Sequence, residues 1–309
     1  MKVIFFGSPT FAVAFLNHLV RNEDIDVVAV VTQPPKASGR SKRPQPSPVN
    51  EAASAYEIPV LTPETLKDEA IQKELAGFEA DIYVVVAYGL ILPKYVLAIP
   101  KQGVINVHPS LLPKFRGPIP MPAAILAGDI KTGVTIMKMD AKMDHGPILA
   151  QLEFPLKDMD YPELEQYVAY KGPELLTQAL LFYAERKLTP KEQDHDKATY
   201  CKLLDRDSGH IEWSKQTAAE IERMIRAYRP WPGTWTTWNG ERLKILDGSV
   251  SAKPLLKKPG SIFQKDGQTL VACKKGALVL EELQLAGKKP MQTNIFLNGN
   301  KNFATSNLV

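Results

Sequence analysis

The stretch Val3-Ile-Phe-Phe-Gly-Ser-Pro-Thr-Phe11 is the first strong indication of the fold. Its four apolar residues have the length and the β-branched and aromatic content of a buried strand. The turn Gly7-Ser8-Pro9 follows at once, and an amphipathic segment of helical length begins at Phe11. The turn lacks the GxGxxG spacing of dinucleotide-binding proteins, so a tight strand-to-helix turn is favoured over a phosphate-binding loop.

The same order of apolar run and helix-length segment recurs through the first half of the chain. Near-continuous apolar strands separated by helices indicate a sheet that is covered on both faces. We therefore predict an α/β fold with a Rossmann-like, doubly wound, mostly parallel sheet. The expected strands are Val3–Phe6, Val27–Val31, Ile82–Ala87, Val104–Val107 and Gly133–Met139, and the expected helices are Phe11–Arg21, Pro48–Tyr56, Pro63–Ala76, Pro120–Ala127 and Pro162–Glu185.

Asn106 and His108 stand at the end of one of these strands, where α/β sheets bind their ligands. Two residues apart, their side chains point the same way. An Asn amide can donate to a developing oxyanion, and His can shuttle a proton near neutral pH. Asp144, in the segment Met-Asp-His-Gly-Pro, could fix the imidazole tautomer and raise its pKa. The spacing alone leaves a second interpretation open, in which these are a turn cap, a backbone-satisfied His and an exposed Asp.

Composition limits the class of protein. The 309 residues, 44% of them hydrophobic, suit about two globular domains, and the formal net charge of +4 permits a polyanionic partner without demanding one. Cys201 and Cys273 lack the spacing of a zinc site, so no metal is expected. The sequence opens with a strand-like run rather than a signal peptide, and no apolar run approaches the roughly 20 residues that span a bilayer. We expect a cytoplasmic protein with no membrane partner.

The string from Asn106 to Gly117, NVHPSLLPKFRG, resembles the formyltransferases that use 10-formyltetrahydrofolate. The resemblance implies that Asn106, His108 and Asp144 are the catalytic trio for acyl transfer without a covalent enzyme intermediate. It also implies 10-formyltetrahydrofolate as the donor co-substrate and no metal. By the same resemblance, the folate-contacting residues are Gly89, Leu90, Leu92, Ser110, Leu111, Leu112 and Pro113.

The stretch from Gln33 to Pro48, QPPKASGRSKRPQPSP, is a long connection between a strand and a helix. It carries four cations and no acid, a combination suited to phosphates. The ordinary alternative is a solvated charged loop. The pattern is similar to the loop that members of the family acting on methionyl-tRNA insert at the acceptor stem. The resemblance therefore implies initiator methionyl-tRNA as partner, with contacts from Lys36, Arg40, Lys42 and Arg43.

The second half of the chain reads as a separate domain. Polar residues 188–200 are expected to be a linker between a catalytic domain, residues 1–187, and a C-terminal domain, residues 201–309. Trp231 and Trp235 are interpreted as core residues rather than base-stacking platforms, and residues 298–309 as a frayed end. Short apolar runs separated by Asn-Gly and Asp-Gly turns indicate a small β-barrel. In the family this is an OB-like tRNA-binding barrel, whose basic face here would be Lys253, Lys257, Lys258, Lys274, Lys275, Lys288 and Lys289.

Together these features predict a monomeric enzyme that transfers a formyl group to the α-amine of methionine on initiator tRNA. Protonated His108 would stabilise the oxyanion together with Asn106, and Asp144 would orient and charge His108. Three alternatives remain open. An amino-sugar N-formyltransferase would keep the trio without needing the basic loop, a 10-formyltetrahydrofolate hydrolase would use water as acceptor, and a non-catalytic RNA-binding protein would keep only the loop and the barrel.

Overall fold

The computed structural model of the protein describes residues 1–37, 43–251 and 257–309. The chain divides into two compact units. The first comprises Met1–Pro120, Lys131–Pro155 and Glu165–Cys201, and the second comprises Met121–Ile130, Leu156–Leu164 and Lys202–Val309. No helix within the described residues is long and apolar enough to cross a membrane.

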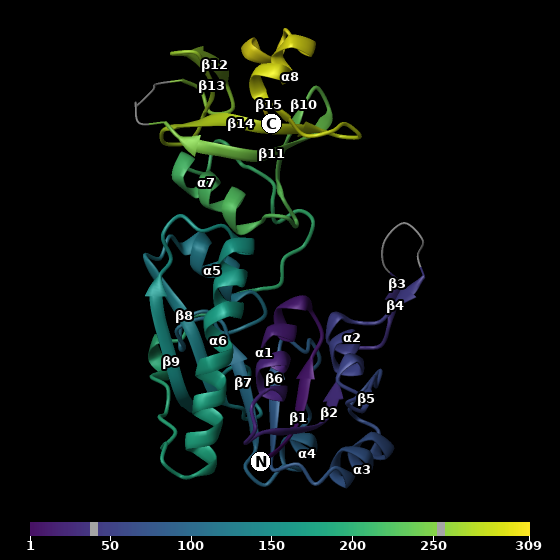
Figure 1. Ribbon diagram of the computed structural model, residues 1–309. Helices are drawn as coiled ribbons and strands as arrows, with labels where there is room; N and C mark the ends of the chain where they lie inside the picture. The colour runs from purple at the N-terminus through teal and green to yellow at the C-terminus, as the bar shows by residue number, and fades with distance from the viewer. Residues whose placement is uncertain (38–42, 252–256) are drawn as a thin grey trace. The chain divides into compact units, whose positions relative to one another are not determined.

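The first unit is built on a seven-stranded sheet with the order β5-β2-β1-β6-β7-β8-β9 (Figure 1). The pairs from β5 to β7 are parallel, whereas β8 and β9 join as antiparallel edge strands. This confirms the predicted mostly parallel sheet. Its strands are β1 (Lys2–Gly7), β2 (Asp26–Val31), β5 (Val60–Leu61), β6 (Ile82–Val86), β7 (Val104–His108), β8 (Lys131–Lys138) and β9 (Ile148–Pro155), and a separate short ladder joins β3 (Lys36–Ala37) to β4 (Pro44–Gln45).

Helices cover both faces of this sheet. Ile4 and Phe6 of β1 pack with Ile71 and Leu75 of helix α3 in one buried cluster. Helix α1 packs against β1, β2 and α2, and its residues are absent from that cluster, so it lies against the other face. The helices of this unit are α1 (Thr10–Val20), α2 (Pro48–Ala55), α3 (Glu69–Gly77), α4 (Lys94–Leu97) and most of α6 (Tyr161–Ala184), with a 3₁₀ turn η1 (His195–Lys197). Helix α5 (Pro120–Ala127) and the first turn of α6 belong to the second unit.

Helix α3 begins later than predicted. The expected helix started at Pro63, but the chain becomes helical only at Glu69. In between, the Thr65 hydroxyl accepts the Lys67 amide hydrogen in a local turn, and Leu66 is buried in the cluster beneath the sheet. Tertiary burial of one leucine and a side-chain turn therefore outweigh the helical spacing of this segment.

The second unit is built on an antiparallel sheet with the order β10-β11-β14-β13-β12, and β15 pairs with β14. Its core joins Trp213 and Ile221 to sheet residues such as Leu243 and Leu278, and to Phe296 and Phe303. The elements are α7 (Ala218–Ala227), β10 (Thr234–Trp238), β11 (Glu241–Val250), β12 (Ile262–Lys265), β13 (Gln268–Ala272), β14 (Ala277–Leu285), β15 (Met291–Gln292), α8 (Thr293–Gly299) and a 3₁₀ turn η2 (Phe303–Thr305).

The end of the chain is not frayed, contrary to the sequence-based expectation. Val309 exchanges two backbone hydrogen bonds with Thr237, at 2.7 and 3.0 Å. Phe303 and Leu308 are buried in the core of the second unit. The tail is ordered because its two apolar residues are buried in the core and its last residue pairs with a strand edge. Both the core and the strand edge exist only in the folded unit.

Candidate active site

Asn106 and His108 lie at the carboxyl end of β7, as expected. Asn106 is opposite Val85 of β6 and Met137 of β8, and His108 is opposite Thr135 of β8. His108 is buried, with 4% of its surface exposed, and Asn106 is half-buried. Because successive side chains of a strand point to opposite faces, the side chains of both residues lie on the same side of the sheet.

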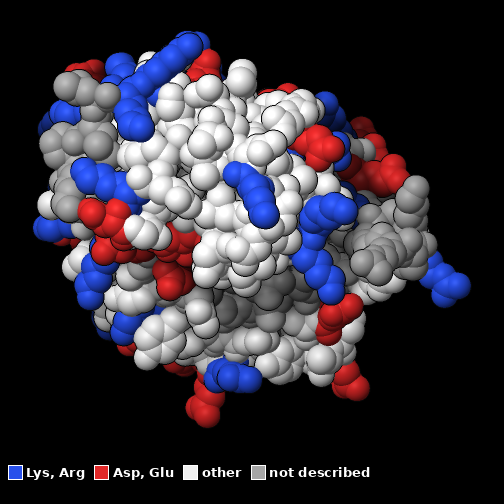
Figure 2. Space-filling model, turned by 90° about the horizontal axis from the view of Figure 1, so that it is seen from above, with Lys and Arg blue, Asp and Glu red and all other residues white. Residues whose placement is uncertain are grey.

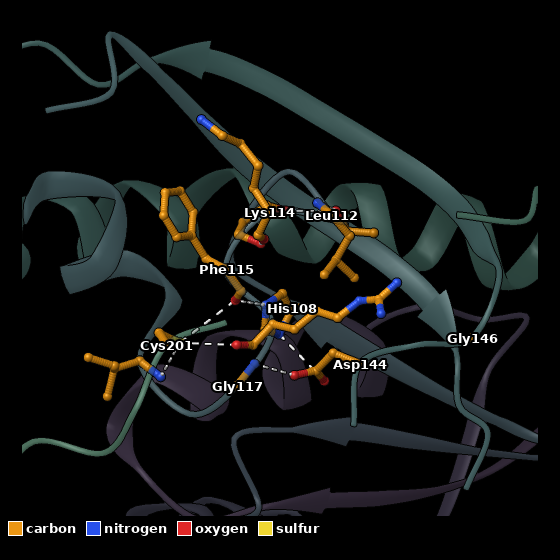
Figure 3. Close-up of polar contacts among 12 residues, drawn as sticks. His108, Leu112, Lys114, Phe115, Gly117, Asp144, Gly146 and Cys201 are labelled. Carbon is orange, nitrogen blue, oxygen red and sulfur yellow. Dashed lines mark hydrogen bonds and ion pairs between the residues drawn. The ribbon is translucent and has the colours of Figure 1, made fainter. Parts of the chain in front are cut away.

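Asp144 is brought to His108 by the loop that connects β8 to β9. Its Oδ1 lies 3.7 Å from His108 Nδ1, and its Oδ2 accepts the backbone N–H of Gly117 at 2.7 Å. Figure 3 shows the Asp144 carboxylate between His108 and Gly117. A charge-assisted bond from a backbone N–H favours the ionised carboxylate, and a carboxylate facing Nδ1 favours a proton on that nitrogen.

The second nitrogen of His108 has a backbone partner. Nε2 lies 2.9 Å from the carbonyl oxygen of Phe115, so this nitrogen carries a hydrogen and Nδ1 is the position that gains or loses a proton. Burial lowers the pKa of His108 below its ordinary value, and the Arg116 cation acts in the same direction. Asp144 and the Phe115 carbonyl oppose this without outweighing it. Instead of the raised pKa that the sequence suggested, the site holds a neutral imidazole.

The loop after β7 is fixed by a buried hydroxyl network. Ser110 Oγ donates to the Lys114 carbonyl at 2.6 Å, and Thr135 Oγ1 donates to the Ser110 carbonyl at 2.6 Å. Gln151 of β9 donates to the Leu112 carbonyl at 2.9 Å. Two non-glycine residues that contribute to the site, Phe115 and Asp144, have positive φ angles of 58° and 47°. Strained backbone held by many hydrogen bonds is a common property of functional sites.

Two residues of this site carry no signal in the sequence and were not predicted. Arg116 is 1% exposed, and Gln193 is 5% exposed. Gln193 accepts from Arg116 and donates to the backbone of the Asp144 loop. Gln193 belongs to the expected linker, residues 188–200, and these residues fall within the first compact unit. A glutamine in a polar stretch has no pattern that distinguishes it from a solvated residue.

The residues expected to contact folate fall into two groups. Leu90 is exposed, and Leu111 and Pro113 are half-buried, so all three are accessible. Leu92, Ser110 and Leu112 are buried, and their side chains serve the core or the hydroxyl network. Ile91, which was not singled out, is 90% exposed beside Leu90.

Gly89 has a structural requirement of its own. Its φ of +85° favours glycine, and a Cβ there would overlap Nε2 of Gln33. That same Nε2 donates to the Tyr88 carbonyl at 2.8 Å. Gly89 therefore allows the start of the basic loop to be joined to the turn after β6.

The basic loop is described only at its two ends. Lys36, in β3, donates from its ammonium to the Gln33 side-chain oxygen. Arg43 precedes β4 and is exposed. The expected contacts Arg40 and Lys42 lie outside the described residues.

Expectations for the second unit needed two corrections. Trp231 is 53% exposed and is not a core residue, because the turn after α7 turns it outward. The described lysines of the expected basic face lie at two ends of the sheet rather than side by side. Residues 257–258 and 274–275 lie where β12 begins and β13 ends, whereas residues 288–289 lie at the opposite end of β14. Figure 2 shows Lys and Arg side chains scattered over the face that it views, among mostly uncharged ones. Lys253 lies outside the described residues.

No group of three or more His, Cys, Asp or Glu residues that could hold a metal ion occurs in the described part of the chain. The arrangement that is present consists of an amide, a neutral imidazole and a carboxylate at a strand end. Such a set can donate to an oxyanion and move one proton.

Comparison with known proteins shows the family to which the chain is related. The formyl transferase family model matches residues 1–180, and the model of the formyl transferase C-terminal domain matches residues 203–301. The chain is 49% identical to the methionyl-tRNA formyltransferase of Roseiflexus castenholzii over 94% of this chain and 93% of that protein. It is 44% identical to the methionyl-tRNA formyltransferase of Chloroflexus aurantiacus over 97% of each chain.

The fold is also similar to that of a solved N-formyltransferase from Helicobacter canadensis, in complex with folinic acid and dTDP-3-aminofucose. The TM-score is 0.68 at 19% identity, over 91% of this chain and 98% of that chain. At that identity the likeness concerns the fold alone. The sequence matches cover both units and nearly the full length of the curated relatives. The chain therefore belongs to the methionyl-tRNA formyltransferase family of formyl transferases.

Proposed function

We propose that the protein transfers the formyl group of 10-formyltetrahydrofolate to the free α-amine of methionine esterified to initiator tRNA. The observation that carries this proposal is near full-length identity of 42–49% to proteins named for that reaction. Solved sugar N-formyltransferases share only the fold, at 18–20% identity, and so do not favour a sugar acceptor.

In the proposed mechanism, Asn106 stabilises the negative charge that develops on the formyl oxygen, and His108 carries the proton. The Asn106 amide donates to the formyl oxygen as the amine nitrogen bonds to the formyl carbon and negative charge develops on that oxygen. Neutral His108 takes the amine proton at Nδ1, beside the Asp144 carboxylate, which stabilises the imidazolium. His108 then returns the proton to N10 as the bond from the formyl carbon to N10 breaks. Formylmethionyl-tRNA and tetrahydrofolate are released, and His108 is neutral again.

The geometry supports this direction of proton transfer. Nε2 is held by the Phe115 carbonyl, and only Nδ1 changes its protonation state. A histidine that begins the reaction neutral can act as a base, whereas the protonated form expected from sequence could not. Folate contacts would come from the accessible residues Leu90, Ile91, Leu111 and Pro113.

The roles proposed for the domains and for the basic loop follow from methionyl-tRNA as the acceptor. We propose residues 1–187 as the catalytic domain, 188–200 as the joining segment and 201–309 as a tRNA-binding domain. The loop cations Lys36, Arg40, Lys42 and Arg43 would bind acceptor-stem phosphates. We also propose that the enzyme is a monomer and, because its substrate belongs to translation, that it works in the cytoplasm.

One assay separates the possible acceptors. The purified protein is incubated with 10-formyltetrahydrofolate and, in turn, methionyl-tRNA, a dTDP-amino sugar or no acceptor, while tetrahydrofolate release is followed. We expect release that depends on methionyl-tRNA, with formylmethionine recovered from the tRNA. Release with the sugar alone or without any acceptor would replace the proposal by a sugar transferase or a hydrolase, and no release at all would leave a binding protein.

A further inference from the structure

Arg116 is a buried cation whose hydrogen-bond partners, in the part of the chain that the structure describes, do not include a carboxylate. Its Nε and Nη2 donate to Gln193 Oε1 at 3.2 and 2.7 Å, and Nη1 donates to the Tyr200 hydroxyl at 3.2 Å. Its Nη2 also lies 2.8 Å from His195 Nδ1. Across the described residues, no carboxylate lies within ion-pair distance of its guanidinium. The geometry of a buried guanidinium then depends on its neutral acceptors, of which Gln193 provides two of the hydrogen bonds.

Gln193 uses the other end of its side chain on a different loop. Its Nε2 donates to the backbone carbonyls of Asp144 at 2.9 Å and Gly146 at 2.7 Å. One buried amide therefore connects the loop after His108, through Arg116, to the loop that carries Asp144. Both ends of the amide are fully used, which fixes its orientation.

The Asp144 loop needs such support. Asp144 has a φ of +47°, and a Cβ on Gly146 would overlap the Lys138 carbonyl oxygen. The chain is therefore folded tightly between β8 and β9, with a non-glycine residue in the left-handed region. The two carbonyls that Gln193 holds flank His145, so the bonds fix the peptide geometry that aims the Asp144 carboxylate.

The segment that carries Gln193 is itself fastened to the loop after His108. Arg116 N–H donates to the Thr199 carbonyl, and Cys201 N–H donates to the Arg116 carbonyl, both at 2.8 Å. Phe115 N–H donates to Thr199 Oγ1 at 2.8 Å. Hydrogen bonds therefore hold the segment of Gln193 in place next to the loop after His108.

We propose that Gln193 is a positioning residue of the active site, whose side-chain amide holds the Asp144 loop against Arg116 and so sets the contact between Asp144 and His108. It touches neither substrate. Its role in turnover rests on the proposed function, whereas its effect on the Asp144–His108 contact does not. The alternative is a purely structural fastening that contributes stability alone.

Two substitutions separate these roles. Gln193→Leu removes both the acceptor for Arg116 and the donor to the Asp144 loop. Gln193→Glu keeps an oxygen for Arg116 but turns another oxygen toward the carbonyls of Asp144 and Gly146, where it repels them. If the hydrogen bonds donated by Gln193 Nε2 position Asp144, we expect both variants to lower kcat by roughly 10- to 100-fold, which is the scale of a misplaced catalytic group. The KM for each substrate should change by less than about 3-fold. Wild-type kcat in Gln193→Glu would overturn the proposal.

A cycle with Asp144→Asn tests whether Gln193 acts through that carboxylate. We expect Gln193→Leu to reduce kcat in the native background and to have little further effect in the Asp144→Asn background. Losses that multiply would show independent roles and would contradict the proposal. Leu176→Ala, at a fully buried position in α6, controls for stability, because it should lower the unfolding temperature without this interdependence.

A titration without substrates completes the test. The chain has five histidines, so the ring proton signal of His108 can be assigned by its loss in His108→Gln and followed with pH by NMR. Asp144 and Arg116 are the charged groups that act on His108. We expect Gln193→Leu, like Asp144→Asn, to move the His108 midpoint to lower pH, because the carboxylate that opposes burial is displaced. An unchanged midpoint would overturn the proposal, whether or not the wild-type protein formylates methionyl-tRNA.

Discussion

Among the single residues, His108 is the one whose charge matters most. Two opposing effects act on its pKa, which are burial and the Asp144 carboxylate. Burial is the stronger influence and lowers the pKa of His108. The trio is therefore better suited to accept a proton at Nδ1 than to present a positive charge. In the proposed mechanism, Asp144 becomes most important after the proton has moved, because its carboxylate, 3.7 Å from Nδ1, would then face an imidazolium.

The lowered pKa predicts the pH dependence of activity. If neutral His108 is the base, the acid limb of kcat/KM that belongs to His108 should lie below pH 6.5, the ordinary histidine value. The α-amine of the substrate, which must be deprotonated to attack, adds a separate limb at roughly pH 8. A pH profile at saturating folate measures both limbs. The limb of His108 is the one that His108→Ala removes from the profile, and a midpoint above 6.5 for that limb would mean that Asp144 outweighs burial.

The same shift predicts a stability change with a defined sign. Between the lowered pKa and 6.5, the unfolded chain binds more protons than the folded one. The contribution of His108 to the free energy of unfolding is therefore present above pH 6.5 and is lost as the pH falls through the folded pKa. Urea unfolding at several pH values should show a decrease in acid that is smaller in His108→Gln.

Removal of each member of the trio should separate chemistry from binding. We expect Asn106→Ala, His108→Ala and Asp144→Ala each to lose roughly 100- to 1,000-fold in turnover, the typical cost of removing an oxyanion donor or proton carrier. Each variant should still bind methionyl-tRNA. Turnover near the wild-type value in His108→Ala would contradict the mechanism.

Among the elements, the turn after β6 and the basic loop are coupled. Gln33 donates to the Tyr88 carbonyl and accepts from Lys36. A side chain at Gly89 would have to displace Gln33 and adopt a positive φ. The turn expected to hold folate is therefore also a support for the start of the loop expected to hold tRNA.

This coupling defines what Gly89→Val should do. We expect weaker tetrahydrofolate binding and also a higher KM for methionyl-tRNA, because the Gln33 contact is broken. Ile91→Asp, at an exposed neighbour, should weaken folate binding without changing the KM for tRNA. Isothermal titration with tetrahydrofolate and steady-state kinetics distinguish the two, and equal folate affinities in all three proteins would place the folate site elsewhere.

The cations of the loop should act through phosphate neutralisation. We expect Arg40→Ala, and more strongly the combined Lys36, Arg40, Lys42 and Arg43 to Ala variant, to raise KM for methionyl-tRNA. The slope of log affinity against log salt should flatten by up to about one for each phosphate that is no longer neutralised. Tetrahydrofolate binding serves as the control and should stay unchanged. Wild-type tRNA kinetics at near-physiological salt would reduce the loop to a solvated charge run.

In the molecule as a whole, the two units have separate apolar cores. One core lies under the parallel sheet, and the other lies between the antiparallel sheet, α7 and α8. The net charge of +4 is small, so binding of a polyanion depends on where the cations lie more than on their sum. The described lysines of the expected basic face are divided between two ends of the second unit's sheet.

Ligand binding should therefore stabilise the two cores unequally. Tetrahydrofolate at 100 times its Kd should stabilise the unit that binds it by about 2.7 kcal/mol. We expect calorimetry to show that the transition sensitive to Leu75→Ala, in the first core, moves up in temperature with the ligand. The transition sensitive to Leu278→Ala, in the second core, should stay in place. A shift of only the second transition would mean that folate binds to the second unit, and would contradict this prediction.

Local sequence was sufficient to predict the elements whose signal lies within a few residues. Apolar runs such as Val3–Phe6 and Val104–Val107 predicted the strands, because a strand buried on both faces needs consecutive apolar residues. The spacing of Asn106 and His108 placed them on one side of a strand end, since side-chain direction follows from the strand period alone. Helix α6 and the antiparallel strands of the second unit were found in the same way.

Features that depend on groups distant in the chain required the folded structure. The charge of His108 follows from burial and from Arg116 and Asp144 together, and no spacing reports a balance of opposing electrostatic effects. Trp231 reads as a core residue in sequence, yet lies exposed, because a turn and not its hydrophobicity sets its direction. Gln193 joins two loops from 49 and 77 residues away, and a polar side chain acquires such a role only when folding removes water from around it.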